Sequence, residues 1–71
     1  MPIPKMLPVE SSAVARIGYD AESEEAYVEY LGGGLYAYEG VPPDVFEELA
    51  EAESKGTFVN AVIKRYPFRE V

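Results

Sequence analysis

The chain has 71 residues, of which 48% are hydrophobic and 27% are charged, a composition typical of one small globular domain. It contains no cysteine and no histidine, which excludes a disulfide framework, a thiol nucleophile and the commonest general base and metal ligand. The net charge is −7, and the eleven acidic side chains of residues 20–53 have no basic neighbour in that segment. Such a surface repels polyanions except near the C-terminal end of the chain.

Three prolines within residues 1–8 fix the backbone and remove amide donors, so we expect residues 1–10 to form an extended arm. This segment lacks the apolar run of a signal peptide, and no stretch of the sequence is apolar over the length of a membrane span. We therefore expect a protein of the cytoplasm that does not contact membranes.

Apolar residues at period two predict three strands, over residues 13–19, 25–31 and 35–39. Turn-forming residues separate them: Asp20 begins the first turn, and a run of glycines from Gly32 to Gly34 makes the second. Gly18, inside the first strand, marks a bulge or a close approach by another backbone. Two short connections between three strands predict an antiparallel meander in chain order.

Two consecutive prolines and an acidic first turn predict a helix over residues 43–54, with Gly56 as a left-handed C-terminal stop. Residues 57–66 repeat apolar side chains at helical spacing after Thr57, a candidate N-cap, and favour a second helix. Their β-branched residues leave a strand as the alternative. The fold we expect is α+β: a three-stranded antiparallel meander with one or two C-terminal helices packed on one face.

Several short motifs follow one another in a characteristic order, and their residues are Ser11, Ser12, Gly18, Tyr19, Gly34, Pro42, Ser54, Gly56, Asn60 and Ile63. Between them stands a Tyr-x-Tyr element, Tyr36 and Tyr38. This order resembles the KTSC domain, a family named for its occurrence at the C-terminus of some lysyl-tRNA synthetases. Members are C-terminal appendages or small proteins of bacteria and phages, and the resemblance implies RNA or tRNA as a partner. It places one domain at residues 11–67, between the arm and a tail at residues 68–71.

Two groups of residues have the chemistry of a nucleic-acid surface. Tyr36 and Tyr38 share one face of a predicted strand, from which aromatic rings stack on bases; the alternative is that they pack in the core. The segment from Lys64 to Arg69 interleaves basic and aromatic side chains, and the alternative for it is a solvated helix end. The candidate RNA-binding residues are Tyr36, Tyr38, Arg16, Lys64, Arg65, Tyr66 and Arg69.

No pattern indicates catalysis, a cofactor or a metal site. Ser11 and Ser12 have no histidine to activate them, and a strand rather than a helix follows the glycine run, which excludes a phosphate-binding P-loop. We therefore expect a non-catalytic binding domain with RNA or tRNA as its partner. The alternative is a protein-interaction module, or a weak homodimer, that uses the exposed edge of residues 13–19 or the acidic helix face.

Overall fold

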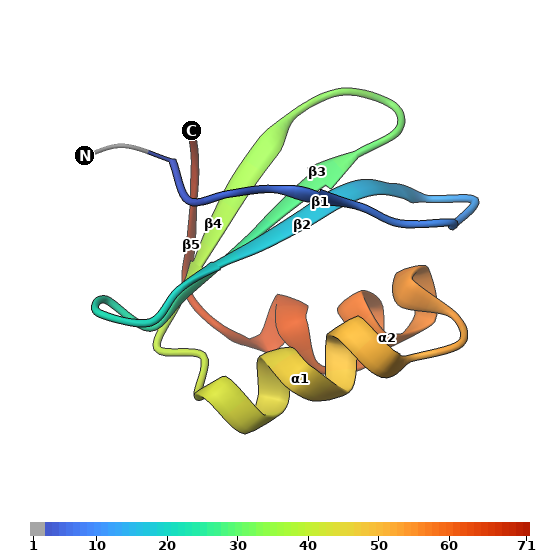
Figure 1. Cartoon of the computed structure of the whole chain (residues 1–71). Coiled ribbons are helices and arrows are strands. Elements are labelled where there is room, and N and C mark those ends of the chain that lie inside the picture. The colour runs from blue at the N-terminus through green and yellow to red at the C-terminus, as the bar shows by residue number, and fades with distance from the viewer. Residues whose placement is uncertain (1–2) are drawn as a thin grey trace.

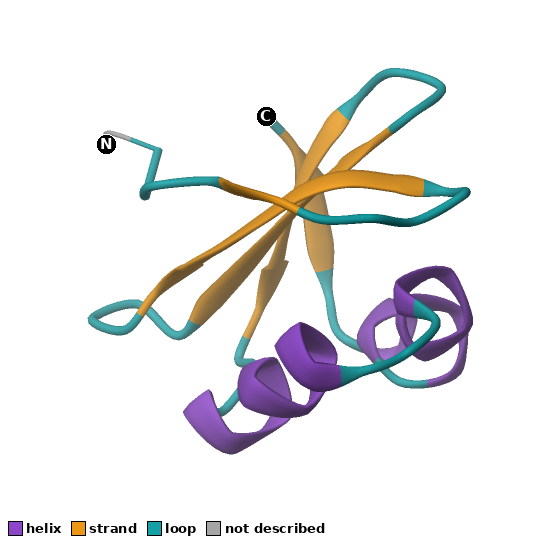
Figure 2. Cartoon of the chain, turned by 45° about the vertical axis from the view of Figure 1, so that its right-hand side comes forward, coloured by secondary structure: helices purple, strands orange, loops and turns teal. Residues whose placement is uncertain are grey.

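One antiparallel sheet carries the helices on one of its faces in the computed structural model, which describes residues 3–71 (Figures 1 and 2). The five strands are neighbours in chain order: β1 (Leu7–Pro8), β2 (Val14–Asp20), β3 (Glu25–Tyr30), β4 (Leu35–Glu39) and β5 (Phe68–Glu70). The helices are α1 (Pro43–Glu51), α2 (Lys55–Ala61) and the short 3-10 helix η1 (Ile63–Arg65). The expected α+β class is confirmed, and β2, β3 and β4 form the expected meander.

The predicted strand count of three is wrong, because both ends of the chain add a strand to the sheet. β1 pairs with β2, with Leu7 opposite Ile17, and β5 pairs with β4, with Tyr36 opposite Glu70. These strands have two and three residues and lie beside prolines, so the sequence shows no periodicity that would predict them. They form because the edges of the meander offer unpaired backbone groups with which they can hydrogen-bond. Met1 and Pro2 of the expected arm lie outside the described residues.

The β2 edge that would support a homodimer is therefore partly covered. Residues 7–8 occupy it as β1, and the amide N–H of Val9 donates to the carbonyl of Ala15 at 3.1 Å. Self-association through residues 13–19 stays a prediction, but the open edge on which it was based is shorter than expected.

The core lies between the helices and the face of the sheet that they cover, which we call the inner face. Its buried side chains come from β2, β3, β4, the connection between β4 and α1, and the three helices, and they are Val14, Ile17, Ala26, Val28, Tyr38, Val41, Leu49, Val59 and Ile63. Burial of these side chains is the main driving force for folding. The period-two alternation of the sequence identified the inner face of β3 and β4, whereas in β2 the register shift between Val14 and Arg16 buries Val14 instead of Ala13 and Ala15.

On the opposite, outer face, the N-terminal arm packs against the sheet at Gly18. A Cβ atom on Gly18 would lie 2.6 Å from Met6 Sδ and 2.9 Å from the Lys5 carbonyl oxygen. Of the two interpretations of this glycine, a bulge or the close approach of another backbone, the close approach is confirmed. The register shift that marks a bulge in β2 lies elsewhere, between Val14 and Arg16.

α1 begins at Pro43, as expected, but it ends at Glu51 and is not stopped by a glycine. Ala52 is the C-cap, and its N–H donates to the Leu49 carbonyl at 3.2 Å. Gly56 lies in the first turn of α2 and is not among the glycines with positive φ, so its expected left-handed conformation is wrong. Its place is explained by a tertiary contact, because a Cβ there would lie 3.1 Å from the Cβ of Ala13.

The second helix is confirmed over the strand alternative, as α2 and then η1, with Pro67 following. Its N-cap is Ser54 instead of Thr57, because the Ser54 Oγ accepts the backbone N–H of Thr57 at 3.3 Å. Among residues 3–71, none of the helices has the length and hydrophobicity that a membrane span requires.

Candidate functional site

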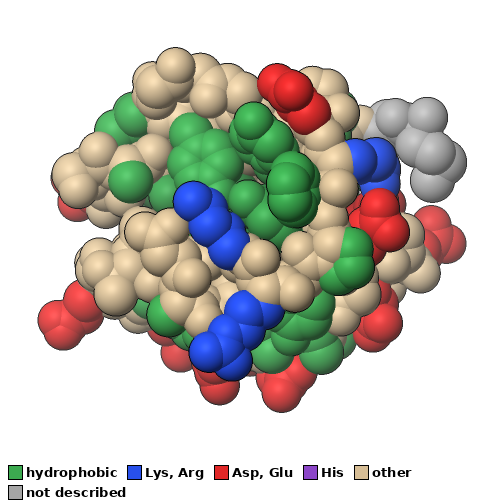
Figure 3. Space-filling model, turned by 180° about the vertical axis from the view of Figure 1, so that it is seen from behind, with side chains coloured by type: hydrophobic (Ala, Val, Ile, Leu, Met, Phe, Trp, Pro, Cys, Tyr) green, Lys and Arg blue, Asp and Glu red, His purple; other side chains and the backbone are tan. Residues whose placement is uncertain are grey.

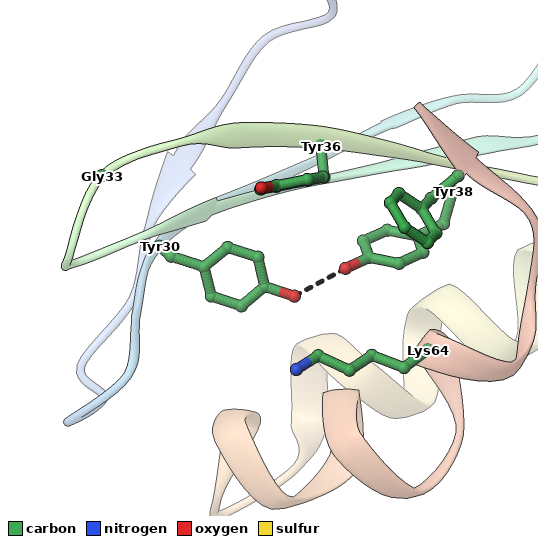
Figure 4. A pocket seen from close by; sticks show the side chains of 6 residues that line it. Tyr30, Gly33, Tyr36, Tyr38 and Lys64 are labelled. Atoms are coloured by element: carbon green, nitrogen blue, oxygen red, sulfur yellow. Dashed lines mark hydrogen bonds between the residues drawn. The ribbon is translucent and has the colours of Figure 1, made fainter. Parts of the chain in front are cut away.

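An open pocket lies between one end of the sheet's inner face and η1 (Figure 4). It has a volume of about 480 Å³ and is lined by Tyr30, Gly33, Tyr36, Tyr38, Lys64 and Phe68. We call it the aromatic pocket. Its walls come from β3, the β3–β4 turn, β4, η1 and β5, so it exists only once distant parts of the chain have folded together.

Strand register brings the aromatic rings together. Tyr36 and Tyr38 are two residues apart on β4 and therefore share a face, and β5 places Phe68 opposite Tyr38. The centroid of the Tyr36 ring lies 5.7 Å from that of Tyr30 and 5.8 Å from that of Phe68, both in edge-to-face geometry. Such pairs hold each ring in a defined orientation. Phe68 is nevertheless 60% exposed, so the rim of the pocket is open to a ligand.

The hydroxyl groups of Tyr30 and Tyr38 form a hydrogen bond at the bottom of the pocket, with an O–O distance of 2.7 Å (Figure 4). Either hydroxyl is able to donate in this bond. Burial, together with the hydrogen bond to Tyr38, raises the pKa of Tyr30, so its hydroxyl keeps its proton at neutral pH. Tyr38 is only 3% exposed and belongs to the core, which agrees with the alternative expected for that residue.

Lys64 supplies the positive charge of the pocket. Its Nζ lies 5.8 Å from the centroid of the Tyr30 ring, within the range of a cation–π contact. The side chain is exposed, and among residues 3–71 it forms no ion pair with a carboxylate. The ammonium group is therefore able to accept an anionic partner.

The β3–β4 turn closes one side of the pocket with glycine. Gly33 and Gly34 have φ values of +108° and +93°, a region that side chains with a Cβ rarely adopt. At Gly34 a Cβ would also lie 3.0 Å from the Tyr36 ring. The glycine run thus makes a tight turn and lets Tyr36 lie directly against it.

Arg16 and Arg69, predicted to join the same surface, lie on the outer face instead. Arg16 forms an ion pair with Glu29, its cross-strand neighbour. Arg69 hydrogen-bonds the carboxylate of Glu25 and lies 3.7 Å from a Glu39 oxygen. The hydrogen bond from Arg69 lowers the pKa of Glu25, and both arginines are occupied by carboxylates. The structure therefore separates them from Lys64.

The remaining predicted residues are divided between the surface and the core. Arg65 is exposed beside Lys64 at the end of η1, and among residues 3–71 it too forms no ion pair. Tyr66 is half-buried and packs against the core. Tyr30, Gly33 and Phe68 line the pocket although they were not among the candidate RNA-binding residues; Phe68 lies within the basic and aromatic segment and Gly33 within the glycine run. The period of β3 put Tyr30 on the inner face, but only the pairing of β5 with β4 reveals Phe68 as a neighbour of Tyr36 and Tyr38.

Most motif residues of the resemblance have structural roles. The Ser11 Oγ accepts the backbone N–H groups of Ala13 and Val14, both at 3.1 Å, and so holds the turn before β2. The Tyr19 hydroxyl donates to the Val41 carbonyl at 2.6 Å, just before Pro42, the N-cap residue of α1. Ile63 is fully buried, whereas Ser12 and Asn60 are exposed.

The pocket has the groups to stack on a flat ring, to exchange hydrogen bonds with it and to attract an anion. Within residues 3–71, no three side chains of a metal-ligating type are grouped closely enough to hold an ion. The protein is thus a small α+β domain, and the aromatic pocket opens at one end of its sheet. The chain belongs to the KTSC domain family, whose model matches residues 10–68.

Similar proteins confirm the resemblance. The chain is 48% identical over 59 residues to a protein of Tsukamurella paurometabola, covering 83% of this chain and 88% of the relative. It is 42% identical over 65 residues to an uncharacterised protein of Stutzerimonas stutzeri, covering 92% of each. A lysine–tRNA ligase of Nostoc punctiforme is 33% identical over 67 residues, which are 93% of this chain and 12% of that protein. A crystal structure of a KTSC domain protein from Yersinia pestis, 34% identical, matches with a TM-score of 0.92 over 94% of this chain and 96% of that one.

Proposed function

We propose that this chain is a non-catalytic binding domain that holds an unpaired base of RNA in the aromatic pocket. The observation that carries the proposal is the combination of exposed aromatic edges with an unpaired lysine in one open pocket. Single-stranded RNA is recognised mainly through bases that stack on aromatic side chains, and each such stack contributes about 1–3 kcal/mol. The exposed ring of Phe68 and the partly exposed ring of Tyr36 are available for this contact.

The local charge supports an anionic ligand although the chain as a whole is acidic. Lys64 and Arg65 lie side by side at η1, and neither is in an ion pair within residues 3–71. The face seen in Figure 3 has basic side chains next to a cluster of hydrophobic ones, with acidic side chains toward its margins. A phosphate on the η1 side of the pocket would therefore meet basic side chains, whereas Glu70, opposite Tyr36 on β5, and the exposed acidic residues of α1 would repel it.

One relative gives further support. The whole length of this chain, apart from a few residues, matches a segment of a lysine–tRNA ligase, a protein whose name makes tRNA its substrate. A domain attached to such an enzyme is well placed to contact an unpaired segment of that RNA. The aromatic rings and the lysine of the pocket support RNA binding independently of that relative's name.

Fluorescence anisotropy with labelled tRNA and single-stranded RNA tests the proposal. We expect binding at about 50 mM salt that weakens at about 200 mM. Phe68→Ala should weaken it about tenfold, because an exposed stacking surface is lost while the core is untouched. Lys64→Ala should also weaken binding, because it removes the cation of the pocket. Lys5→Ala is its matched control, because it removes a cation from the arm on the outer face instead.

Absence of binding at low salt would refute the RNA proposal. The same samples then test the protein-interaction alternative by sedimentation. In that case the exposed side chains of β5 and its neighbour, Phe68 and Val71, would be the first surface to mutate.

A further inference from the structure

We infer that the aromatic pocket takes one splayed nucleotide with any of the four bases, and that it does not follow a continuous run of RNA. This inference rests on the proposed function, and it specifies how much of the RNA chain is bound. Three observations carry it: the unpaired cations of η1, the size of the pocket, and the reversible hydroxyl pair at its floor.

The cations set the number of phosphates. Lys64 lines the pocket and Arg65 is the next residue of η1, whereas Arg16 and Arg69 are held by carboxylates on the opposite face. A domain that followed an RNA strand would need a row of cations along a groove. Within residues 3–71, Lys64 and Arg65 are the two cations of η1 and neither forms an ion pair, so we expect the site to neutralise at most about two phosphates, the pair that flanks a single nucleotide.

The size of the pocket fits the same ligand. Its volume of about 480 Å³ lies in the range of pockets that enclose one small molecule. The glycine turn bounds one side, and the aromatic edge-to-face contacts of Tyr36 with Tyr30 and Phe68 bound another. A base inserted there would be separated from the stack of its neighbours.

The hydroxyl pair offers the base a donor and an acceptor side by side. In one arrangement Tyr30 donates to Tyr38, which leaves the Tyr38 proton to donate onward; in the other arrangement the roles are exchanged. Bases present donors and acceptors in different orders along their edges. A pair able to reverse its direction complements either order, so it does not select among the bases.

NMR chemical-shift titration with the four ribonucleoside 5′-monophosphates, and with homopolymeric tetranucleotides of the same bases, tests the inference. We expect each mononucleotide to shift the signals of Tyr36, Phe68 and Lys64, with dissociation constants within about tenfold of those for the tetranucleotides. For the tetranucleotides the affinity should fall about sevenfold between about 50 and about 200 mM salt, from a slope of about −1.4. Lys64→Ala should reduce that slope to about −0.7, and Lys5→Ala should leave it unchanged.

Different results separate the two proposals. If RNA of every length fails to bind, the proposed function itself fails. If tetranucleotides bind with a slope of about −3 while mononucleotides leave the spectrum unchanged, RNA binding stands and the single-nucleotide inference is overturned. If one base binds more than tenfold better than the others, base tolerance is overturned. Tyr30→Phe, which keeps the ring, should then show whether the hydroxyl pair is the source of the selection.

Discussion

Each face of the sheet places a tyrosine beside a cation, and the surroundings of the two pairs differ. On the outer face Arg69 lies against Tyr27, at 3.4 Å from its hydroxyl, and both bond the carboxylate of Glu25. Tyr27 is 3% exposed there. On the inner face Lys64 lies over Tyr30 and, within residues 3–71, forms no ion pair with a carboxylate, and the rings beside it remain partly exposed. The same residue types thus hold the sheet together on one face and leave a binding surface on the other.

This difference shows when a cation beside an aromatic ring remains able to bind a ligand. A cation that already has a carboxylate within hydrogen-bond distance releases little energy on meeting a phosphate, because the new contact replaces an old one. A cation in water beside a half-exposed ring loses no such partner. Partner availability, rather than residue type, therefore separates Lys64 from Arg16 and Arg69.

The largest expected effect on stability is at the inner face, where it distinguishes the core from the rim of the pocket. Tyr38→Ala should lower the free energy of unfolding by about 3–5 kcal/mol, because it removes a buried ring and leaves a cavity. Phe68→Ala, at the exposed rim, should lower it by less than about 1 kcal/mol. Urea denaturation followed by circular dichroism measures both. Equal losses would mean that the rim is part of the core, and the pocket would lose its claim to be a binding surface.

The next largest loss of stability is expected on the outer face, where the arm contacts the sheet. Gly18→Ala should destabilise the domain by about 1–3 kcal/mol, because the new Cβ would overlap Met6 Sδ and the Lys5 carbonyl oxygen. Gly32→Ala is the control, since a Cβ there has no neighbour within 4 Å. Denaturation gives the energies, and NMR shifts of residues 4–6 report the displaced arm. An unchanged stability for Gly18→Ala would show that the arm does not pack on the sheet in solution.

A smaller effect is expected at the floor of the pocket. Tyr30→Phe should cost about 0.5–1.5 kcal/mol, because it removes the hydrogen bond to the Tyr38 hydroxyl. Tyr36→Phe should cost less, since the structure gives the Tyr36 hydroxyl no hydrogen bond within residues 3–71. The comparison uses thermal and urea denaturation of the two variants side by side. The opposite order would place the stabilising hydroxyl at the rim.

The smallest effect is a pH dependence of the outer face. Hydrogen bonding to Arg69 lowers the pKa of Glu25 below its ordinary value of 4.5, so the contact stabilises the fold fully above about pH 4.5. That contribution is lost as the pH falls through the lowered pKa. In Arg69→Gln, NMR titration should show the pKa of Glu25 moving upward. Arg16→Gln should leave Glu25 unchanged and raise the pKa of Glu29, its own partner.

The sequence by itself determined the elements that depend on local patterns. Alternation at period two identified β2, β3 and β4, and the acidic turn after two prolines identified the start of α1. It also anticipated the close approach at Gly18, because a glycine weakens a strand and stands inside one chiefly where the strand bulges or another backbone comes close. It could not interpret Gly56, whose surroundings depend on Ala13, a residue far away in the chain.

Only the tertiary structure decided the outer strands and the pocket. β1 and β5 are too short to have a period of their own, so they exist because the meander offers edges to pair with. Periodicity states which face of a strand a side chain takes, but it carries no information about which distant residue lies opposite. Arg69 bonds Glu25 across 44 residues of sequence, and Lys64 meets no such carboxylate within the described chain. Which cation stays unpaired, and so where a ligand would bind, is a property of strand register and of the closed fold.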